Sequence, residues 1–303
     1  MNNIIVSVCV ITYNHCDYIR QCLDGILMQK VDFPIEIIIN DDCSTDGTRE
    51  IIQEYERNYP ELFVATYQVE NQYSKGIRGM YARFCFPKAR GKYIALCEGD
   101  DYWTDPLKLQ KQVCFLEQNP QYVICSHIYN YYFQNSNQLI TSVIKEQEYD
   151  LDFLIYGGWL FHPLTVMFRK SAIDIVKLLE YKIGMDAVLF YHILHKGKGY
   201  CIDENMAVYR IHDGGVWSNK KSEVKLVQEF EARISIYDID GSDNAAKFLL
   251  TQFTKPYGRK ELLKHCRLLF RTVHIVRKHF GLRLVIKIIF DKMILGKDYK
   301  YSY

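Results

Sequence analysis

The 303-residue chain carries a formal net charge of +2, and its length allows about three quarters of its unfolded surface to be buried, in one large domain or in one domain with an appendage. Its ten cysteines form no C-x-x-C pair, which argues against a thiolate zinc site. No apolar run reaches the ~18 residues of a transmembrane helix, and no basic segment precedes the first apolar run as in a signal peptide. These features favour a reducing, cytoplasmic compartment.

In the first half of the chain, continuous apolar runs alternate with segments of helical periodicity. The apolar runs predict strands over residues 4–12, 36–40, 63–69 and 92–96. The periodic segments predict helices over residues 17–29 and 76–90, with another helix through Tyr55. Because continuous apolar strands joined by helices are typical of a parallel sheet covered on both faces, we expect an α/β fold.

The second half is more mixed. It predicts helices over residues 108–118 and 186–195 and strands over residues 122–133, 165–169 and 199–211. From about Ser222 the pattern is helical, and residues 255–303 carry thirteen Lys/Arg against three Asp/Glu. Since the rest of the chain is net acidic, we expect an acidic body over residues 1–221 and a basic helical extension over residues 222–303.

Apolar residues recur between the basic residues of this extension. A basic amphipathic helix is typical of a peripheral membrane contact, here with the inner face of the plasma membrane. The alternative is that the apolar stripe packs on the body while the charges face water, and the sequence leaves both open. Nucleic-acid binding is disfavoured because no recognised motif accompanies the charge.

Three carboxylates, Glu98, Asp100 and Asp101, follow the buried strand predicted at 92–96. Like charges repel one another at a strand end, and Mg²⁺ or Mn²⁺ typically bridges such carboxylates to substrate phosphates. The alternative is a loop in which the acids are simply solvated. Because open α/β sheets bind ligands at the carboxyl ends of their strands, the run predicts a metal–diphosphate site.

Polar side chains also follow the first two predicted strands. Thr12, Tyr13 and Asn14 end the first, and Asp41 and Asp42 end the second. An aromatic ring can stack on a base, a carboxylate can accept a hydrogen bond from a base N–H, and hydroxyl or amide groups can bind ribose or phosphate. Each of these residues alone is an ordinary turn residue, but their recurrence at adjacent strand ends predicts one nucleotide cleft.

Segments 6–14, 40–48 and 91–103, in this order, closely resemble the family 2 glycosyltransferases. The resemblance extends from residue 4 to about residue 218. It implies the GT-A fold, a Rossmann-like, mixed but mainly parallel sheet with helices on both faces. It also implies a nucleotide-sugar donor, with uridine diphosphate as the carrier that prevails in the family.

The same resemblance implies roles for the strand-end residues. Thr12, Tyr13 and either Asp41 or Asp42 lie where the family binds the base and its ribose, with Asn14 beside them. We therefore expect these residues to contact the nucleotide sugar.

Glu98 and Asp100 occupy the outer positions of the D-x-D motif of this family. Asp100 is thereby implied as the ligand of Mn²⁺ or Mg²⁺. Glu98 departs from the motif, and its longer arm places it near the ribose or a metal-bound water. Asp101 is expected to support the metal ligand or to orient the sugar.

The catalytic base of the family is an Asp at the start of a helix beneath the acceptor site, and Asp186 fits this position, with Met185 where Glu is common. Its alternative role is to cap the helix. Further along, Arg210 and His212 share one side of a strand that precedes two glycines. We expect them to clamp the departing diphosphate, with His212 completing the metal sphere; a structural hydrogen-bonding His is the alternative.

The resemblance implies an inverting, non-processive enzyme that transfers one sugar to a hydroxyl of a glycan or of a lipid-linked cell-surface polysaccharide precursor. Processive relatives usually carry a Gln-x-x-Arg-Trp motif, and no Trp of this chain follows an Arg. A sugar nucleotidyltransferase is a second candidate, although no glycine-rich phosphate loop follows the first strand. A non-catalytic nucleotide-sugar-binding protein, with the cleft but without the base, is a third.

Overall fold

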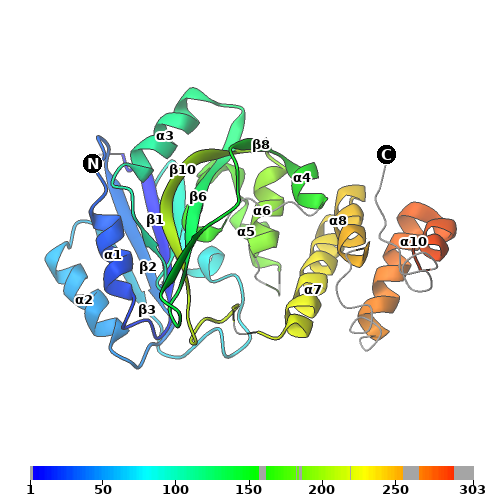
Figure 1. Cartoon of the computed structure of the whole chain (residues 1–303), viewed down its shortest axis with the longest axis horizontal. Helices are drawn as coiled ribbons and strands as arrows, with labels where there is room; N and C mark the ends of the chain where they lie inside the picture. The colour runs from blue at the N-terminus through cyan, green and yellow to red at the C-terminus, as the bar shows by residue number, and fades with distance from the viewer. Residues whose placement is uncertain are drawn as a thin grey trace. The chain divides into compact units, whose positions relative to one another are not determined.

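The computed structural model describes residues 3–156, 162–181, 183, 186–218, 220–254 and 266–289, and Met185 lies outside them. The chain divides into two compact units, one of Met1–Leu151 and Leu160–Asp213 and one of Asp152–Trp159 and Gly214–Tyr303. Every predicted site residue lies in the first unit, several of whose helices and strands are labelled in Figure 1. The domain boundary expected at residue 221 stays a prediction.

The described strands of the first unit form one ten-stranded sheet. They are β1 (Val6–Thr12), β2 (Ile35–Asp41), β3 (Phe63–Tyr67), β4 (Tyr93–Glu98), β5 (Tyr102–Trp103), β6 (Tyr122–Phe133), β7 (Gln138–Thr141), β8 (Gln147–Tyr149), β9 (Met167–Arg169) and β10 (Lys198–Ile211). The main order is β3-β2-β1-β4-β9-β6-β10-β5, with β7 paired to β6 and β8 to β10. Strands β1 to β4 pair in parallel, as do β6 and β10, whereas β5, β7, β8 and β9 pair antiparallel. This mixed sheet confirms the predicted fold class.

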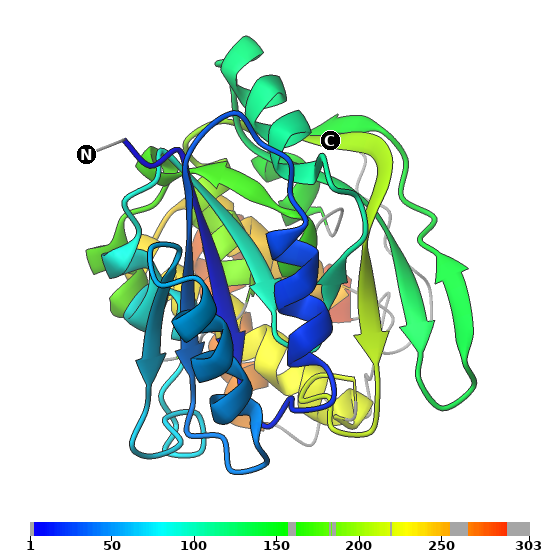
Figure 2. The ribbon, with the colours of Figure 1, turned by 90° about the vertical axis from the view of Figure 1, so that its left-hand side faces the viewer.

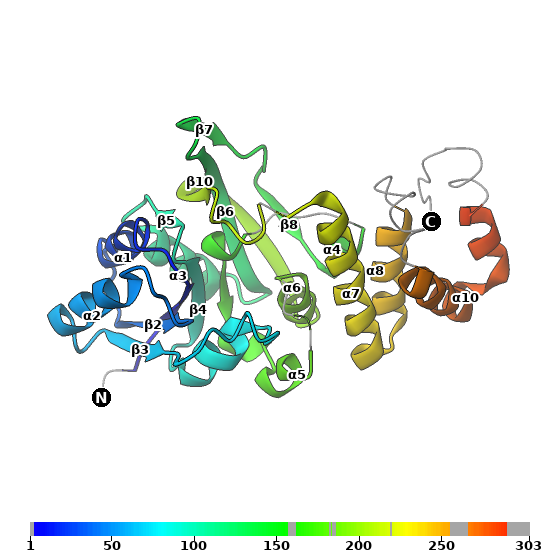
Figure 3. The ribbon, with the colours of Figure 1, turned by 90° about the horizontal axis from the view of Figure 1, so that it is seen from below.

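Helices cover both faces of this sheet. The helices α1 (Ile19–Leu27), α2 (Thr48–Asn58) and α3 (Lys108–Gln118) lie on one face, as Figure 2 shows for α1 and α2. The other face is covered by α5 (Ile175–Leu179), α6 (Asp186–Leu194) and the short helix η1 (Tyr81–Cys85) (Figure 3). Because both faces of the sheet are covered, β1, β2 and β4 are almost entirely buried, and most of their side chains are apolar.

The helix expected over residues 76–90 is much shorter in the structure. Only η1 and the 3₁₀ turn η2 (Phe86–Lys88) are helical there. Gly76 and Gly79 have φ values of 84° and 71°, which no right-handed helix contains, and Pro87 has no N–H to donate. The apolar periodicity of this segment therefore builds a packed surface without a regular helix.

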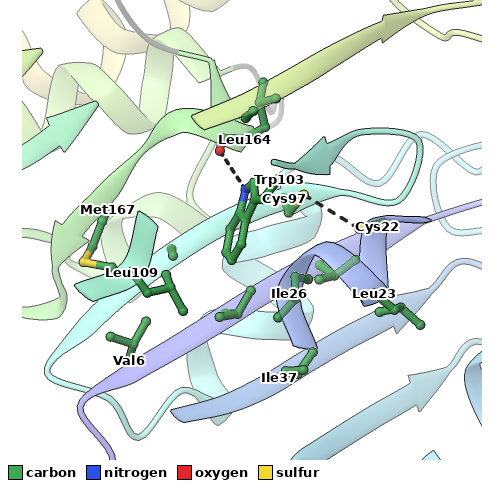
Figure 4. Packing of buried hydrophobic residues seen from close by; sticks show 14 of the residues in the cluster. Val6, Cys22, Leu23, Ile26, Ile37, Cys97, Trp103, Leu109, Leu164 and Met167 are labelled. Atoms are coloured by element: carbon green, nitrogen blue, oxygen red, sulfur yellow. Dashed lines mark hydrogen bonds between the residues drawn. The ribbon is translucent and has the colours of Figure 1, made fainter. Parts of the chain in front are cut away.

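The core of the first unit lies between the sheet and the helices α1 and α3 (Figure 4). Trp103 of β5 is 2% exposed, and its indole N–H donates to the carbonyl of Leu164 at 2.9 Å. The thiols of Cys22 and Cys97 lie 3.7 Å apart beside it, and the nine cysteines from Cys9 to Cys201 are all free. Burial of Trp103 fixes the chain that immediately follows the predicted metal motif.

The second unit contains the helices α7 (Ser222–Asp240), α8 (Asp243–Thr254) and α10 (Cys266–Ile289), the last of which is interrupted at Gly281. It also contains most of the short helix α4 (Leu151–Ile155). These helices confirm the predicted helical extension. Its core joins Leu226 and Phe230 of α7 to Leu249 of α8 and Ile275 of α10, whereas Phe270 is 73% exposed. No described helix is both long enough and apolar enough to cross a membrane; a peripheral membrane contact stays a prediction.

Candidate active site

Strand register brings the three predicted strand ends side by side. Thr12 lies opposite Asp41 in the pairing of β1 with β2, and Ile11 lies opposite Glu98 in the pairing of β1 with β4. The N–H of Gly99 donates to the carbonyl of Ile11 at 3.0 Å. A Cβ on Gly99 would lie 2.5 Å from the Thr12 hydroxyl oxygen, so only glycine allows this approach.

Asp100 faces two imidazoles. Its Oδ2 lies 3.1 Å from Nε2 of His212 and 3.7 Å from Nε2 of His15. Burial raises the pKa of Asp100, but the imidazoles of His15 and His212 outweigh it, so the pKa lies below its usual value. One charged carboxylate and two ring nitrogens thus converge at the end of β4.

The pKa values of Glu98 and Asp101, the two acids that flank Asp100, are raised, whereas that of Asp100 is lowered. Burial raises the pKa of Glu98 well above its usual value, and the charge of Asp100 adds to this; the same two causes raise the pKa of Asp101. Asp101 is 1% exposed. Its Oδ1 accepts the main-chain N–H of Arg210 at 2.8 Å, and its Oδ2 has no hydrogen-bond partner in the described part of the chain. The site therefore favours a proton or a cation beside these acids.

Arg210 is 7% exposed, and its guanidinium is bound within the protein. Nε donates to the main-chain carbonyl of Asp100 at 2.9 Å, and Nη1 donates to Gln134 at 3.0 Å. Nη2 donates to Gln21, and the guanidinium carbon lies 4.9 Å from the centre of the Tyr18 ring. This geometry makes Arg210 a support that ties β10 to the predicted metal motif, and its contact with a diphosphate stays a prediction.

The carboxylates of Asp41 and Asp42 accept hydrogen bonds from the loops that follow β2 and β3. Asp41 accepts the main-chain N–H of Ser44 at 3.1 Å and Nε of Arg49 at 3.0 Å. Asp42 accepts the main-chain N–H groups of Gln72 and Tyr73 at 2.8 and 3.0 Å. Both side chains are buried. A nucleotide base could therefore contact only the part of each carboxylate that these hydrogen bonds leave exposed.

The end of β1 offers a different set of groups. Tyr13 is 41% exposed, which leaves its ring available for stacking. Asn14 adopts a φ of 53°, and its Oδ1 accepts the main-chain N–H of Thr45 at 2.9 Å. The hydroxyl of Thr12 lies 3.1 Å from Nδ1 of His15, so this strand end is linked to the group around Asp100.

Asp186 is the first residue of α6. Burial raises the pKa of its carboxyl to about 6. Its charge contributes to the raised pKa of Glu98. Asp186 therefore lies within electrostatic range of Glu98 in the predicted metal motif, and its catalytic role stays a prediction.

Sequence reasoning missed two aromatic residues of this group. His15 approaches Asp100, and the ring of Tyr18 lies 4.5 Å from that of His212. Burial lowers the pKa of His15, which favours a neutral imidazole. His15 follows the Thr12-Tyr13-Asn14 run directly and Tyr18 lies three residues further on, and this closeness in sequence is the one signal that pointed to them.

The donor set around Asp100 fits a divalent cation. Carboxylate oxygen and imidazole nitrogen are accepted together by ions such as Mn²⁺, and the unpartnered Oδ2 of Asp101 is a further oxygen nearby. Within the described ranges no three His, Cys, Asp or Glu side chains are arranged to hold an ion by themselves. An ion bound here would therefore take further oxygens from substrate phosphates or water.

Comparison with known proteins identifies the class to which this fold and site belong. Residues 7–175 match the model of Glycosyl transferase family 2, and the chain therefore belongs to this family. It is 36% identical over 218 residues to an uncharacterized protein of Mycobacterium tuberculosis, covering 70% of this chain but only 60% of that relative.

Relatives with a named activity match over a similar length. The chain is 31% identical over 226 residues to the UDP-Glc:alpha-D-GlcNAc-diphosphoundecaprenol beta-1,3-glucosyltransferase WfaP of Escherichia coli, covering 73% of this chain and 82% of WfaP. It is 29% identical over 220 residues to the putative teichuronic acid biosynthesis glycosyltransferase TuaG of Bacillus subtilis, covering 71% of this chain and 82% of TuaG.

Solved structures share the fold. TarS 1–349 of S. aureus, in complex with UDP-GlcNAc, superposes with a TM-score of 0.66 at 19% identity, covering 99% of this chain and 94% of that one. The mannosyltransferase PcManGT of Pyrobaculum calidifontis, in complex with GDP-Man and Mn²⁺, gives a TM-score of 0.53 at 15% identity, with coverages of 96% and 88%. These likenesses confirm the GT-A fold.

Proposed function

We propose that this protein is an inverting, non-processive glycosyltransferase that moves one sugar from a UDP-sugar to a hydroxyl of a glycan or lipid-linked polysaccharide precursor. The observation that carries the proposal is the arrangement at the end of β4, where Asp100 faces His212 and where Glu98 lies within electrostatic range of Asp186, the first residue of α6. The name of WfaP, which states a UDP-glucose donor and a lipid-diphosphate acceptor, supports the donor and acceptor classes.

In the proposed reaction Asp186 acts as the general base. With a pKa raised to about 6 by burial, its carboxylate is ionised at neutral pH and is more basic than an exposed Asp. It takes the proton of the acceptor hydroxyl while the hydroxyl oxygen bonds to the anomeric carbon. The bond from that carbon to the diphosphate oxygen breaks, and the nucleoside diphosphate leaves with the electron pair, so the configuration inverts.

The residues around Asp100 serve the leaving group. His15 and His212 fix the Asp100 carboxylate, and Asp101 and Arg210 fix the backbone around it. A divalent cation held by Asp100 and His212 would offset the negative charge that develops on the diphosphate. Tyr13 is proposed to stack on the base, with Thr12 and Asn14 at the ribose or phosphates.

The identity of the released product tests this proposal. The purified chain is incubated with a panel of nucleotide sugars and Mn²⁺, and the released nucleotide is identified by anion-exchange chromatography. We expect nucleoside diphosphate, with the UDP-sugars as the best donors. A parallel incubation supplies nucleoside triphosphates with sugar 1-phosphates, and release of pyrophosphate there would instead support the nucleotidyltransferase alternative. Donor binding without any product in either incubation would support a non-catalytic binding protein.

A further inference from the structure

The strand β7 exposes apolar side chains at an edge of the sheet. Leu139 and Ile140 are 59% and 50% exposed, and Val143 just beyond the strand is 96% exposed. Among the described strands, β6 alone pairs with β7, and Figures 2 and 3 both show β7 at the outside of this unit.

This sheet edge lacks the charged residues and prolines that normally prevent a sheet edge from pairing with other strands. Natural proteins blunt sheet edges with charged residues or proline, because a free apolar edge pairs with other strands. Residues 121–144, which include β7 and its loops, contain no Asp, Glu, Lys, Arg or Pro. An edge of this composition is typical of a strand that a partner covers.

The hydrogen bonds of β7 fix which of its groups face outward. The N–H of Ser142 donates to the carbonyl of Tyr129 in β6 at 2.9 Å. In an antiparallel pair the residues alternate between facing the partner strand and facing away, so Ile140 faces β6 as Ser142 does. The N–H and C=O groups of Leu139 and Thr141 therefore point away from β6.

We propose that β7 pairs antiparallel with β7 of a second copy of this chain, with the two-fold axis passing beside Ile140. In this register Leu139 of each copy exchanges hydrogen bonds with Thr141 of the other copy. Ile140 lies opposite its own counterpart in the close, non-hydrogen-bonded position, with Cα atoms about 4.5 Å apart. A two-fold interface of this kind brings the same patch of both copies together.

The side chains favour a second copy over another occupant. Tyr131 of β6 lies opposite Ile140 within one copy, so the paired sheets carry an unbroken row of Tyr131, Ile140, Ile140 and Tyr131 on one face. Directly opposed aromatic and β-branched side chains stabilise antiparallel pairs. Self-pairing sets Ile140 against its equivalent and Leu139 against Thr141, and the absence of charged residues in this segment means that no like charges meet.

The first test substitutes Ile140, which in the proposed dimer lies opposite Ile140 of the second copy. The full chain is compared by sedimentation-velocity ultracentrifugation over a range of concentrations with Ile140→Glu, with Ile140→Lys and with an equimolar mixture of the two. We expect a dimer for the unsubstituted chain, monomers for each variant alone because like charges oppose each other at the axis, and a restored dimer for the mixture. Val69→Glu, which alters a 91% exposed valine elsewhere, should leave the dimer intact.

A second measurement tests the register directly. Ile140→Cys should give a disulfide-linked dimer on non-reducing gels with oxidised glutathione as the electron acceptor, whereas Val143→Cys should give far less. A monomeric unsubstituted chain at every concentration, or a dimer that survives Ile140→Glu, would overturn the proposal. So would loss of binding to phosphatidylglycerol vesicles in Ile140→Glu without a change in mass, since that result would assign β7 to a membrane surface.

Discussion

The carboxylates of the site differ in state because their surroundings differ. Asp100 has two imidazoles within 4 Å, and their presence outweighs the effect of burial on its pKa. Burial raises the pKa of Asp186, whose described surroundings add no such compensation. Environments that push the pKa values of neighbouring acids apart are typical of sites that assign them different roles. The sequence predicted the acids themselves, but it contains no signal for these shifts.

The raised pKa of Asp186 predicts a pH dependence. A base must be deprotonated to act, so kcat/KM of the unsubstituted enzyme should fall as the pH drops through about 6. Asp186→Asn should lower kcat by about 10²–10⁴-fold and should remove this ionisation from the profile. Steady-state rates from pH 5 to 8 in the presence of Mn²⁺ check this, with Asp32→Asn, at an exposed carboxylate, as the control. An Asp186→Asn profile that kept the same inflection would assign it to another group.

Lys108 predicts a pH dependence of stability rather than of activity. Its amine is fully buried, donates to Gln112 at 2.7 Å and lies 4.1 Å from the Trp103 ring. Burial lowers its pKa to about 7, whereas the unfolded chain keeps the proton to about pH 10. Between these values the unfolded state binds more protons, so the free energy of unfolding should rise with pH, by up to about 1.4 kcal/mol per unit.

Lys108→Met isolates this effect from the other titrating groups. Urea unfolding between pH 7 and 9 should show that the free energy of unfolding of the unsubstituted protein increases relative to that of the variant. Parallel curves for the two proteins would show that the buried amine does not titrate in this range.

At the scale of elements, the sequence predicted most of the sheet because its strands are continuously apolar. Helix α3 and strand β6 occupy the predicted residues 108–118 and 122–133. Residues 76–90 do not form the single helix that their apolar periodicity predicted, because Gly76, Gly79 and Pro87 do not fit a regular helix there. His15 and Tyr18 were missed because only the turn after β1, a tertiary feature, aims them at His212.

The contact between α1 and β5 predicts the effect of a single methyl group. A Cβ on Gly25 would lie 2.9 Å from the main-chain oxygen of Trp103 and 3.0 Å from its nitrogen. Alanine favours a helix by about 1 kcal/mol over glycine, but overpacking against backbone costs about 1–3 kcal/mol. Gly25→Ala should therefore lower the free energy of unfolding, by about 1 kcal/mol, in chemical denaturation.

The matched control is Glu50→Ala, at an exposed position of α2, which should change stability by less than about 0.5 kcal/mol. If Gly25→Ala were more stable than the unsubstituted protein, α1 and β5 could not be packed as closely as the structure has them.

At the scale of the whole molecule, the basic helical extension raises the question of a membrane. Ile275 and Val276 of α10 are buried, whereas Phe270 is exposed, so only part of the apolar stripe is used inside the second unit. If the extension binds a membrane, the 303-residue chain should co-sediment with vesicles of anionic lipid, and salt should weaken this binding. A version ending near Ser222 should stay in the supernatant, and equal sedimentation of both would contradict this role.

The central claim is that Asp100 and Asp186 act in one reaction but at different stages, the first on the nucleotide and the second on the acceptor. Release of UDP by Asp100→Asn and Asp186→Asn, together with titration calorimetry of UDP in the presence of Mn²⁺, measures both stages. We predict that Asp100→Asn loses UDP affinity and turnover together, whereas Asp186→Asn binds UDP as the unsubstituted protein does but transfers about 10²–10⁴-fold more slowly. Full turnover in either variant would contradict the account.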